Sequence, residues 1–417
     1  MAVNTLSMAA GPIGAALLAP ILARTLGAEG RGEMAAILAP LTFADAFATV
    51  GIPAAIAYFR ARGTGSARLV RLALPALVTA GLLAYLVLFL FAPTVAGRHG
   101  LDLGVVRILW AAVLAGIVLA VLRACRQGEA NWTRLNLEAV LGPVLRVAAC
   151  GALFLTGSES VQLVTAVYLG SGIVVGLVLV RPRAAAAHPL KPHAEPTRGE
   201  LTSFGLRSWA TTLSSVVNAR IDQLVLAVAL PAYQLGLYAV SVTVAELPSV
   251  LYRAAAPVLF TRVAGGYGWD GSARVVRLVA WSSAILATGL AVVAAPLVEL
   301  VFGAEFAGAV VLVQILLAGA VLAASATAIG AVLAASGSPG LVSLTEAGGV
   351  VATLLGMLLA VPRWGAVGAA VTVSLTQLLL WGSRATIFVR ASGLGLSSLL
   401  VLRRADLAAV LAGGRAR

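Results

Sequence analysis

The stretch RPRAAAAHPLKPHAEPTRGE, residues 181–200, is the longest polar and proline-rich segment of the chain. Apolar runs of about 20 residues, the length that an α-helix needs to cross a bilayer, lie on both sides of it. We predict a linker at residues 181–203 that joins a six-helix lobe at residues 1–180 to a second six-helix lobe at residues 204–390. The twelve predicted spans are residues 4–22, 34–58, 72–93, 105–122, 137–155, 161–180, 204–230, 233–258, 275–301, 307–335, 341–361 and 366–389.

The composition is typical of a membrane protein and excludes an ordinary soluble domain. Of the 417 residues, 60% are hydrophobic and 11% are charged, and the mean hydropathy is +1.01. A net charge of +13 would suit a nucleic-acid-binding protein if the basic residues gathered on one folded surface, but they lie between the apolar runs. We therefore predict an all-α integral membrane protein that binds no nucleic acid.

The basic residues also predict the orientation of the chain. Most of them fall in every second gap between the spans and in the C-terminal tail. The outer side has only Arg24, Arg31, Arg98, Arg107 and Arg363. Because short loops rich in Lys and Arg stay in the cytoplasm, we expect both termini there. The tail, residues 391–417, is expected to form an amphipathic helix on the inner leaflet or to remain solvated.

Weak internal repeats relate the two predicted lobes. The segment Leu26–Gly32 after the first span is echoed 204 residues later by Leu230–Gly236 after the seventh. Glu138 of the fifth span is similarly matched by Glu346 of the eleventh. Because each lobe has an even number of spans, the copies share one orientation, as in transporters built from parallel repeats. Two such lobes are expected to enclose a central cavity.

Motifs of enzymatic chemistry are scarce. Lys191, the sole lysine, does not lie in a phosphate-binding G-x-x-x-x-G-K-[ST] loop. Residues 266–271 fit G-x-G-x-x-G, but no βαβ pattern surrounds them, so we interpret them as a flexible loop. The three histidines are isolated in predicted loops and are expected to be solvated: His99, His188 and His193. We predict a protein without cofactor, metal site or enzymatic activity.

Ionisable residues inside the predicted spans are the candidate functional residues. Each costs roughly 2.5–3.5 kcal/mol on insertion scales, so such residues usually line a cavity or form ion pairs. The predicted substrate-binding residues are Arg220, Asn218, Asp222, Gln223 and Arg146. The carboxylates available for ion coupling are Asp45, Asp222 and Glu246. A structural ion pair for Arg220 and a packing role between helices for Arg146 remain open.

Four segments at the span boundaries carry a family resemblance. They are Ala23–Gly32, Asn218–Asp222 followed by Leu235–Ala239, Val301–Ala309 and Trp364–Ala370. In this order the chain resembles the polysaccharide and lipid-linked oligosaccharide flippases of the multidrug/oligosaccharidyl-lipid/polysaccharide exporter superfamily. Lipid II flippases of this superfamily carry arginines in the first span. Residues 4–22 hold none, which favours the O-antigen or exopolysaccharide branch.

The resemblance implies a two-lobed exporter in the bacterial cytoplasmic membrane. It would move an undecaprenyl-diphosphate-linked oligosaccharide from the inner to the outer leaflet by alternating access, among membrane lipids and beside a polysaccharide polymerase or glycosyltransferases. Two alternatives stay open. One is a cation-coupled antiporter of drugs or small solutes, whose cavity should be more acidic and aromatic. The other is a non-transporting scaffold of a polysaccharide-assembly complex.

Overall fold

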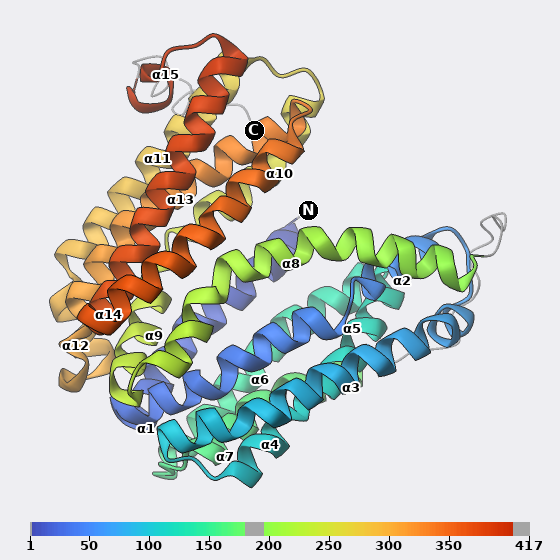
Figure 1. Cartoon of the computed structure of the whole chain (residues 1–417), viewed down its shortest axis with the longest axis vertical. Coiled ribbons are helices and arrows are strands. Elements are labelled where there is room, and N and C mark those ends of the chain that lie inside the picture. The colour runs from blue at the N-terminus through green and yellow to red at the C-terminus, as the bar shows by residue number, and fades with distance from the viewer. Residues whose placement is uncertain (1, 180–195, 403–417) are drawn as a thin grey trace. The chain divides into compact units, whose positions relative to one another are not determined.

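The computed structural model of the chain describes residues 2–179 and 196–402, and every regular element within these ranges is helical (Figure 1). This confirms the predicted all-α fold. The helices form two compact units, Met1–Ala239 and Val240–Arg417. Most of the predicted linker, and the predicted tail helix beyond residue 402, lie outside the described residues.

The first unit contains helices α1 to α8 and the start of α9. Their bounds are α1 Ala2–Ala48, α2 Ile52–Ala61, α3 Ser66–His99, α4 Leu103–Trp110, α5 Ala112–Gly128, α6 Trp132–Leu155, α7 Val161–Leu179, α8 Arg198–Ala229 and α9 Ala232–Ala245. Helix α8 packs against α1, α2 and α3 and so belongs to this unit. The sequence analysis groups the same segment with the C-terminal lobe, and those lobe boundaries stay a prediction.

Helix α1 is a hairpin of two helices that reverse at Gly27. This residue has φ 66° and ψ −177°, a left-handed conformation that glycine adopts without steric cost. Leu18 and Leu22 before the turn share a buried cluster with Met34 after it, so the two halves pack side by side. Helix α1 therefore holds the first predicted span and much of the second.

The second unit contains the rest of α9 and the following helices. Their bounds are α10 Ser249–Ala264, α11 Trp269–Val292, α12 Ala294–Phe302, the 3-10 helix η1 Ala304–Phe306, α13 Ala309–Ala335, α14 Pro339–Ser392 and α15 Ser397–Leu400. Helix α14 reverses at Gly365, which has φ 55°. The hydroxyl of Thr353 donates to that of Thr376, 3.1 Å away, across the two halves. The eleventh and twelfth predicted spans thus form one hairpin.

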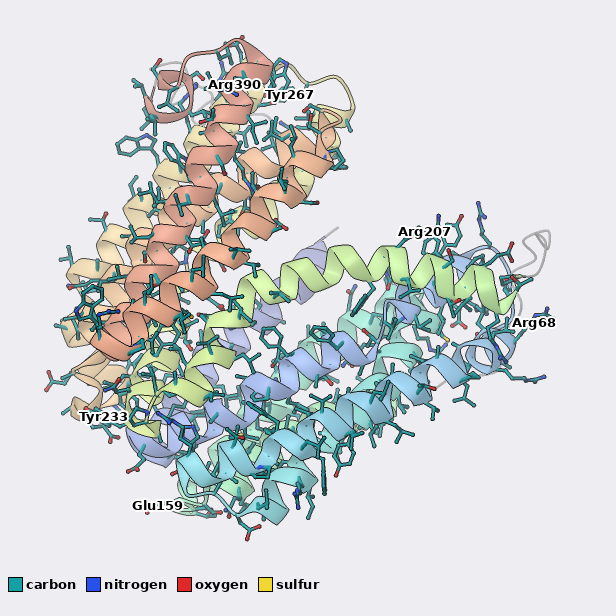
Figure 2. All side chains as sticks on the ribbon, in the orientation of Figure 1. Arg68, Glu159, Arg207, Tyr233, Tyr267 and Arg390 are labelled. Carbon is teal, nitrogen blue, oxygen red and sulfur yellow. The ribbon has the colours of Figure 1, made fainter. Side chains whose placement is uncertain are left out.

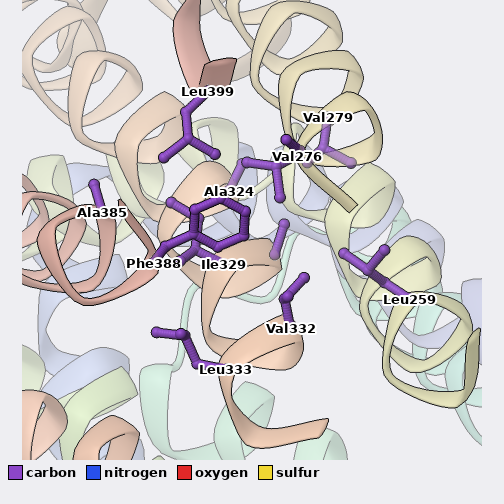
Figure 3. Packing of buried hydrophobic residues seen from close by; sticks show 12 residues of the cluster. Leu259, Val276, Val279, Ala324, Ile329, Val332, Leu333, Ala385, Phe388 and Leu399 are labelled. Atoms are coloured by element: carbon purple, nitrogen blue, oxygen red, sulfur yellow. The ribbon is translucent and has the colours of Figure 1, made fainter. Parts of the chain in front are cut away.

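The core of the second unit lies between α10, α11, α13 and α14 (Figure 3). Its fully buried side chains include Val276, Ile329 and Phe388. Leu399 of the short helix α15 joins this cluster, and Arg277 of α11 donates to the carbonyl of Ser398. These contacts fix the first turn of the C-terminal tail against α11.

The outer faces of the helices are suited to lipid. Eight helices are long and apolar enough to cross a membrane, counted over the described residues, and two of them are the hairpins α1 and α14. Helices α8 and α9 are not among these eight. A multi-pass membrane protein is confirmed, whereas the count of twelve spans stays a prediction. Large apolar side chains such as Leu90, Ile285 and Leu358 are about 70% exposed, as lipid-facing residues are.

Charged and aromatic side chains lie at both ends of the first unit (Figure 2). In the first unit Arg68 and Arg207 lie at one end, and Glu159 and Tyr233 lie at the other. This separation within one unit matches the side assigned to each gap by the distribution of basic residues.

The prediction that His99 is solvated is wrong. Its ring is 6% exposed, and Nε2 lies 2.8 Å from the carbonyl oxygen of Ala227. The neighbouring Arg98 donates from Nη2 to the carbonyl of Ala229, 2.6 Å away. The last carbonyls of a helix have no partner within it, so the end of α3 satisfies those of α8.

Candidate functional site

The helical structure is interrupted between α1 and α2 by a break at Thr49, Val50 and Gly51. Val50 and Gly51 both have positive φ angles, 45° and 66°. A Cβ atom on Gly51 would collide with the carbonyl oxygen of Gly205 and lie 2.8 Å from the backbone nitrogen of Trp209. Glycine is required here for its backbone angle and because α8 approaches so closely.

Trp209 of α8 packs against this break and hydrogen-bonds to it. Because the helical ladder ends, the Val50 amide donates to Phe47 instead of to the carbonyl of Ala46. The indole Nε1 of Trp209 donates to this released carbonyl, 2.9 Å away. The Trp209 ring also packs edge-on against Phe47, with 5.7 Å between the ring centroids. The Thr49 hydroxyl also donates to the Ala46 carbonyl at 3.2 Å, so two side chains satisfy the backbone group that the helical ladder no longer uses.

A cavity of about 700 Å³, the arginine pocket, opens on one side of the break. It lies between α2, α5 and the start of α6. Its lining residues are Thr49, Gly51, Pro53, Ala54, Ala57, Tyr58, Ala61, Ala120, Arg123, Ala124, Gln127 and Trp132. An arginine, an amide and two aromatic rings thus face a wall of small residues.

Arg123 supplies the charge of the arginine pocket. Its Nε and Nη2 atoms donate to Oε1 of Glu138, at 2.8 and 2.6 Å. The Glu138 side chain is 9% exposed, whereas that of Arg123 is 49% exposed. A guanidinium carries five N–H donors, so the buried carboxylate orients the arginine and leaves most of its donors for a ligand.

The second unit has a related ion pair. Glu346, the repeat partner of Glu138, accepts from Nη2 of Arg384 at 3.0 Å. The first-unit position that corresponds to Arg384 in the repeat is Gly176, 208 residues earlier. This glycine also lies beside the glutamate, since a Cβ atom on Gly176 would lie 3.0 Å from Oε1 of Glu138. Each repeated glutamate therefore has an arginine partner, but the arginine comes from α5 in the first unit and from the last part of α14 in the second.

A second cavity of about 640 Å³, the apolar groove, also borders the break. It is formed by α1, α3 and α8. Its lining residues are Pro40, Phe43, Ala44, Phe47, Val50, Ala80, Leu83, Ala84, Val87, Leu88, Phe91, Trp209 and Leu224. The apolar groove and the arginine pocket thus share the break but differ in chemistry.

Asp45, predicted for ion coupling, lies on α1 beside the break. A Cβ atom on Gly116 of α5 would lie 2.8 Å from its Oδ1. This oxygen is buried and has no hydrogen-bond partner among the described residues. A carboxylate in this position is suited to take up a cation or a proton.

Asp222, predicted to line a cavity, is buried with Tyr238. The Tyr238 hydroxyl donates to Oδ2 of Asp222 at 2.6 Å, and the tyrosine is fully buried. Arg220, Gln223 and Glu246 are partly buried. The predicted polar stripe on α8 included Ser214, Ser215 and Asn218, whose side chains lie outside the described residues.

Arg146, also predicted as a substrate ligand, lies between α6 and α7. Its guanidinium stacks on the Tyr168 ring at 4.3 Å from the centroid, and Nε donates to the Tyr168 carbonyl at 3.2 Å. A Cβ atom on Gly172 would lie 2.6 Å from its Nη2. The structure therefore shows Arg146 in the packing arrangement that the sequence left as an alternative.

The sequence analysis missed the arginine pocket. It assigned Arg123 to a loop and treated Glu138 only as a mark of the repeat. A usable signal was present: Glu138 is an acidic residue inside a predicted span, which requires a partner, and Arg123 directly follows the preceding span.

The sequence comparison identifies the family. Residues 1–262 match the family described as polysaccharide biosynthesis protein. The chain belongs to this family. Membership in the polysaccharide biosynthesis protein family confirms the resemblance inferred from the span boundaries. No curated protein sequence matches the chain.

Solved structures of the exporter superfamily share the fold of this family member. The lipid II flippase MurJ, in an inward closed conformation, has a TM-score of 0.75 and 11% identity over 100% of this chain and 97% of its own. An inward-facing multidrug resistance MATE family transporter of the MOP superfamily has a TM-score of 0.72 and 14% identity, over 95% of this chain and 98% of its own. At such identities the similarity establishes the fold of a membrane transporter.

Proposed function

We propose that the protein flips an undecaprenyl-diphosphate-linked oligosaccharide from the inner to the outer leaflet by alternating access during surface polysaccharide biosynthesis. The observation that carries this proposal is the half-exposed Arg123 in a cavity of about 700 Å³, in a member of a polysaccharide biosynthesis family. Such a protein is a transporter and catalyses no covalent step.

The arginine pocket has the chemistry that a diphosphate headgroup requires. Guanidinium donors bind phosphate oxygens strongly because the hydrogen bonds are charge-assisted. Gln127 and Thr49 add neutral polar groups, and Tyr58 and Trp132 add flat apolar surface beside them. A cavity lined mainly by apolar groups with a few placed polar ones is typical of ligand sites. These groups would replace the hydration that the headgroup loses.

The charge of the substrate offers a driving force. An interior-negative potential favours outward movement of an anion by ~2.3 kcal/mol per charge per 100 mV. No nucleotide is needed for this step. Coupling to a cation through Asp45, Asp222 or Glu246 is compatible with the same mechanism.

We place the protein in the bacterial cytoplasmic membrane with both termini in the cytoplasm. The basic residues of every second gap support this orientation. In that orientation the arginine pocket, between the end of α5 and the start of α6, faces the leaflet in which lipid-linked sugars are assembled. A polymerase and glycosyltransferases are the partners that this role requires.

Two other functions make different demands on the pocket. An exporter of cationic drugs, the class suggested by the fold shared with the MATE transporter, would need acidic groups facing the ligand. Glu138 instead turns its carboxylate to Arg123 and is buried, which favours an anionic substrate. A non-transporting scaffold would tolerate loss of Arg123.

The direct test is the location of the substrate lipid in cells. Depletion of the protein should make lipid-linked oligosaccharide accumulate in the inner leaflet, and expression of the wild-type chain should clear it. A glycosidase added outside spheroplasts cuts only glycan in the outer leaflet. Accumulation in the inner leaflet would therefore be measured as glycan that the enzyme does not cut. Equal susceptibility with and without the protein would refute the proposal.

A further inference from the structure

The proposed flippase mechanism uses the arginine pocket and gives the apolar groove no role. Every side chain that lines it is hydrocarbon except that of Trp209. The single polar atom of that side chain, Nε1, already donates to the carbonyl of Ala46. The lining side chains therefore offer no free hydrogen-bonding group, and a polar ligand would lose its hydration there without compensation. The occupant must be apolar.

The groove lies at the depth of the hydrocarbon layer. Helix α3, which forms one wall, is a candidate membrane span. The same helix exposes Leu82, Leu86 and Leu90 on faces that do not line the groove. Large exposed leucines in a spanning helix face lipid tails. The material surrounding the groove is thus hydrocarbon chains.

The groove and the arginine pocket are lined by neighbouring residues of the chain. Phe47 and Val50 line the groove, whereas Thr49 and Gly51 line the pocket. Consecutive Cα atoms are only about 3.8 Å apart, so the two cavities approach each other at the break. A molecule with an anionic head and an apolar tail is the ligand whose chemistry matches the two linings.

We propose that the apolar groove binds the proximal part of the polyprenyl tail of the substrate while Arg123 binds its diphosphate. This inference rests on the proposed function and adds the site of the tail. Phospholipids also carry a phosphate head and apolar tails, so they are the competing occupants that the test must include. The volume of about 640 Å³ is that of a ligand pocket.

The tail gains little hydrophobic free energy in the groove, because it leaves an equally apolar bilayer. The groove acts by holding the tail in one direction and so fixing the headgroup in the pocket. The effect should therefore appear as a dependence of transport rate on tail length. A short tail that does not fill the groove should lose this advantage.

The first experiment compares two variants of α3. Ala84→Trp fills the groove, whereas Leu86→Trp adds the same ring at a lipid-exposed position outside it. Each would be reconstituted in proteoliposomes with N-acetylglucosaminyl diphosphate carried on an undecaprenyl or a farnesyl chain. We expect the wild type and Leu86→Trp to flip the long lipid on the order of tenfold faster than the short one. Ala84→Trp should flip both at the slow rate.

The outcomes separate the two proposals. A tail-length preference that survives in Ala84→Trp would overturn the groove assignment and leave the flippase function intact. A wild-type protein that flips neither lipid would overturn both. Loss of short-chain transport in Ala84→Trp alone would show damage to the pocket and would also count against a tail-specific groove.

A second experiment uses adjacent positions of equal exposure and does not depend on a bulky substitution. Leu82 and Leu83 are 55% and 56% exposed, but only Leu83 lines the groove. p-Benzoylphenylalanine at residue 83 should crosslink undecaprenyl-diphosphate N-acetylglucosamine at least fivefold more than at residue 82, in excess phospholipid. Equal labelling at the two positions would contradict the assignment.

Discussion

Gly32 of α1 and Gly236 of α9 lie in reciprocal contact. A Cβ atom on Gly32 would collide with the carbonyl oxygen of Ala232, and one on Gly236 would collide with that of Ala28. Each glycine contacts the residue four positions before the other, and the two pairs are separated by 204 residues. Within the first unit, the contact thus joins equivalent positions of the repeat predicted from the sequence.

This contact predicts that neither glycine tolerates a side chain. Gly32→Ala or Gly236→Ala should each lower the free energy of unfolding by about 1–3 kcal/mol, because backbone atoms cannot move aside as a side chain can. Thermal unfolding of the purified protein would measure the loss. Gly30→Ala is the matched control, since the three atoms nearest to its Cβ would belong to the side chains of Val161 and Leu26. Equal stability of Gly32→Ala and Gly30→Ala would contradict the close contact.

The proposed role of Arg123 predicts a specific loss of export. Arg123→Gln removes the charge but keeps a polar side chain, and it should reduce flipping by about 10–100-fold, the value of a charge-assisted hydrogen bond. Surface polysaccharide and the flipping rate in proteoliposomes would be measured at equal protein levels. Arg71→Gln, an exposed arginine outside the pocket, is the control and should flip normally. Unchanged flipping by Arg123→Gln would remove the pocket from the mechanism.

Arg220 gives an independent prediction from the sequence. It is partly buried on α8, in a region that the sequence analysis assigns to the cavity. Arg220→Ala should abolish export while the protein level in the membrane stays normal, because the cavity would lose a cationic group. Immunoblotting of membranes and surface polysaccharide would test both parts. Arg146→Ala, which removes a packing group against Tyr168, should instead lower stability. Normal surface polysaccharide in Arg220→Ala would defeat this assignment.

Apolar runs and glycine positions predicted much of the fold. Hydropathy predicted the hairpins α1 and α14 as pairs of spans, since long apolar segments specify spanning helices whatever their partners. The pairing of charges was harder to predict, because it depends on which helices become neighbours. Arg146 is opposite Tyr168 and Arg123 is opposite Glu138 only after α5, α6 and α7 have packed. The break at Val50 and Gly51 was missed because it interrupts an apolar run without a charged residue.

The ion pair between Arg384 and Glu346 in the second unit predicts that losing the glutamate alone lowers stability more than replacing both charged residues. Arg384 is 6% exposed and donates to Glu346, to the Thr345 hydroxyl at 3.1 Å and to the Ala326 carbonyl at 3.2 Å. Glu346→Ala leaves the buried guanidinium without its counter-ion, so it should lower the free energy of unfolding by roughly 3 kcal/mol.

The double variant Arg384→Met with Glu346→Met should be more stable than Glu346→Ala, because it removes both charges and fills the space with apolar atoms. Thermal unfolding of both purified variants would provide the comparison. Arg123→Met is the control in the first unit, because it leaves the buried carboxyl of Glu138 without its partner. A proton can neutralise a buried carboxyl, so Arg123→Met should lower the free energy of unfolding by less than Glu346→Ala does. A double variant less stable than Glu346→Ala would show that Arg384 stabilises the fold through its contacts with Thr345 and Ala326 rather than through its charge.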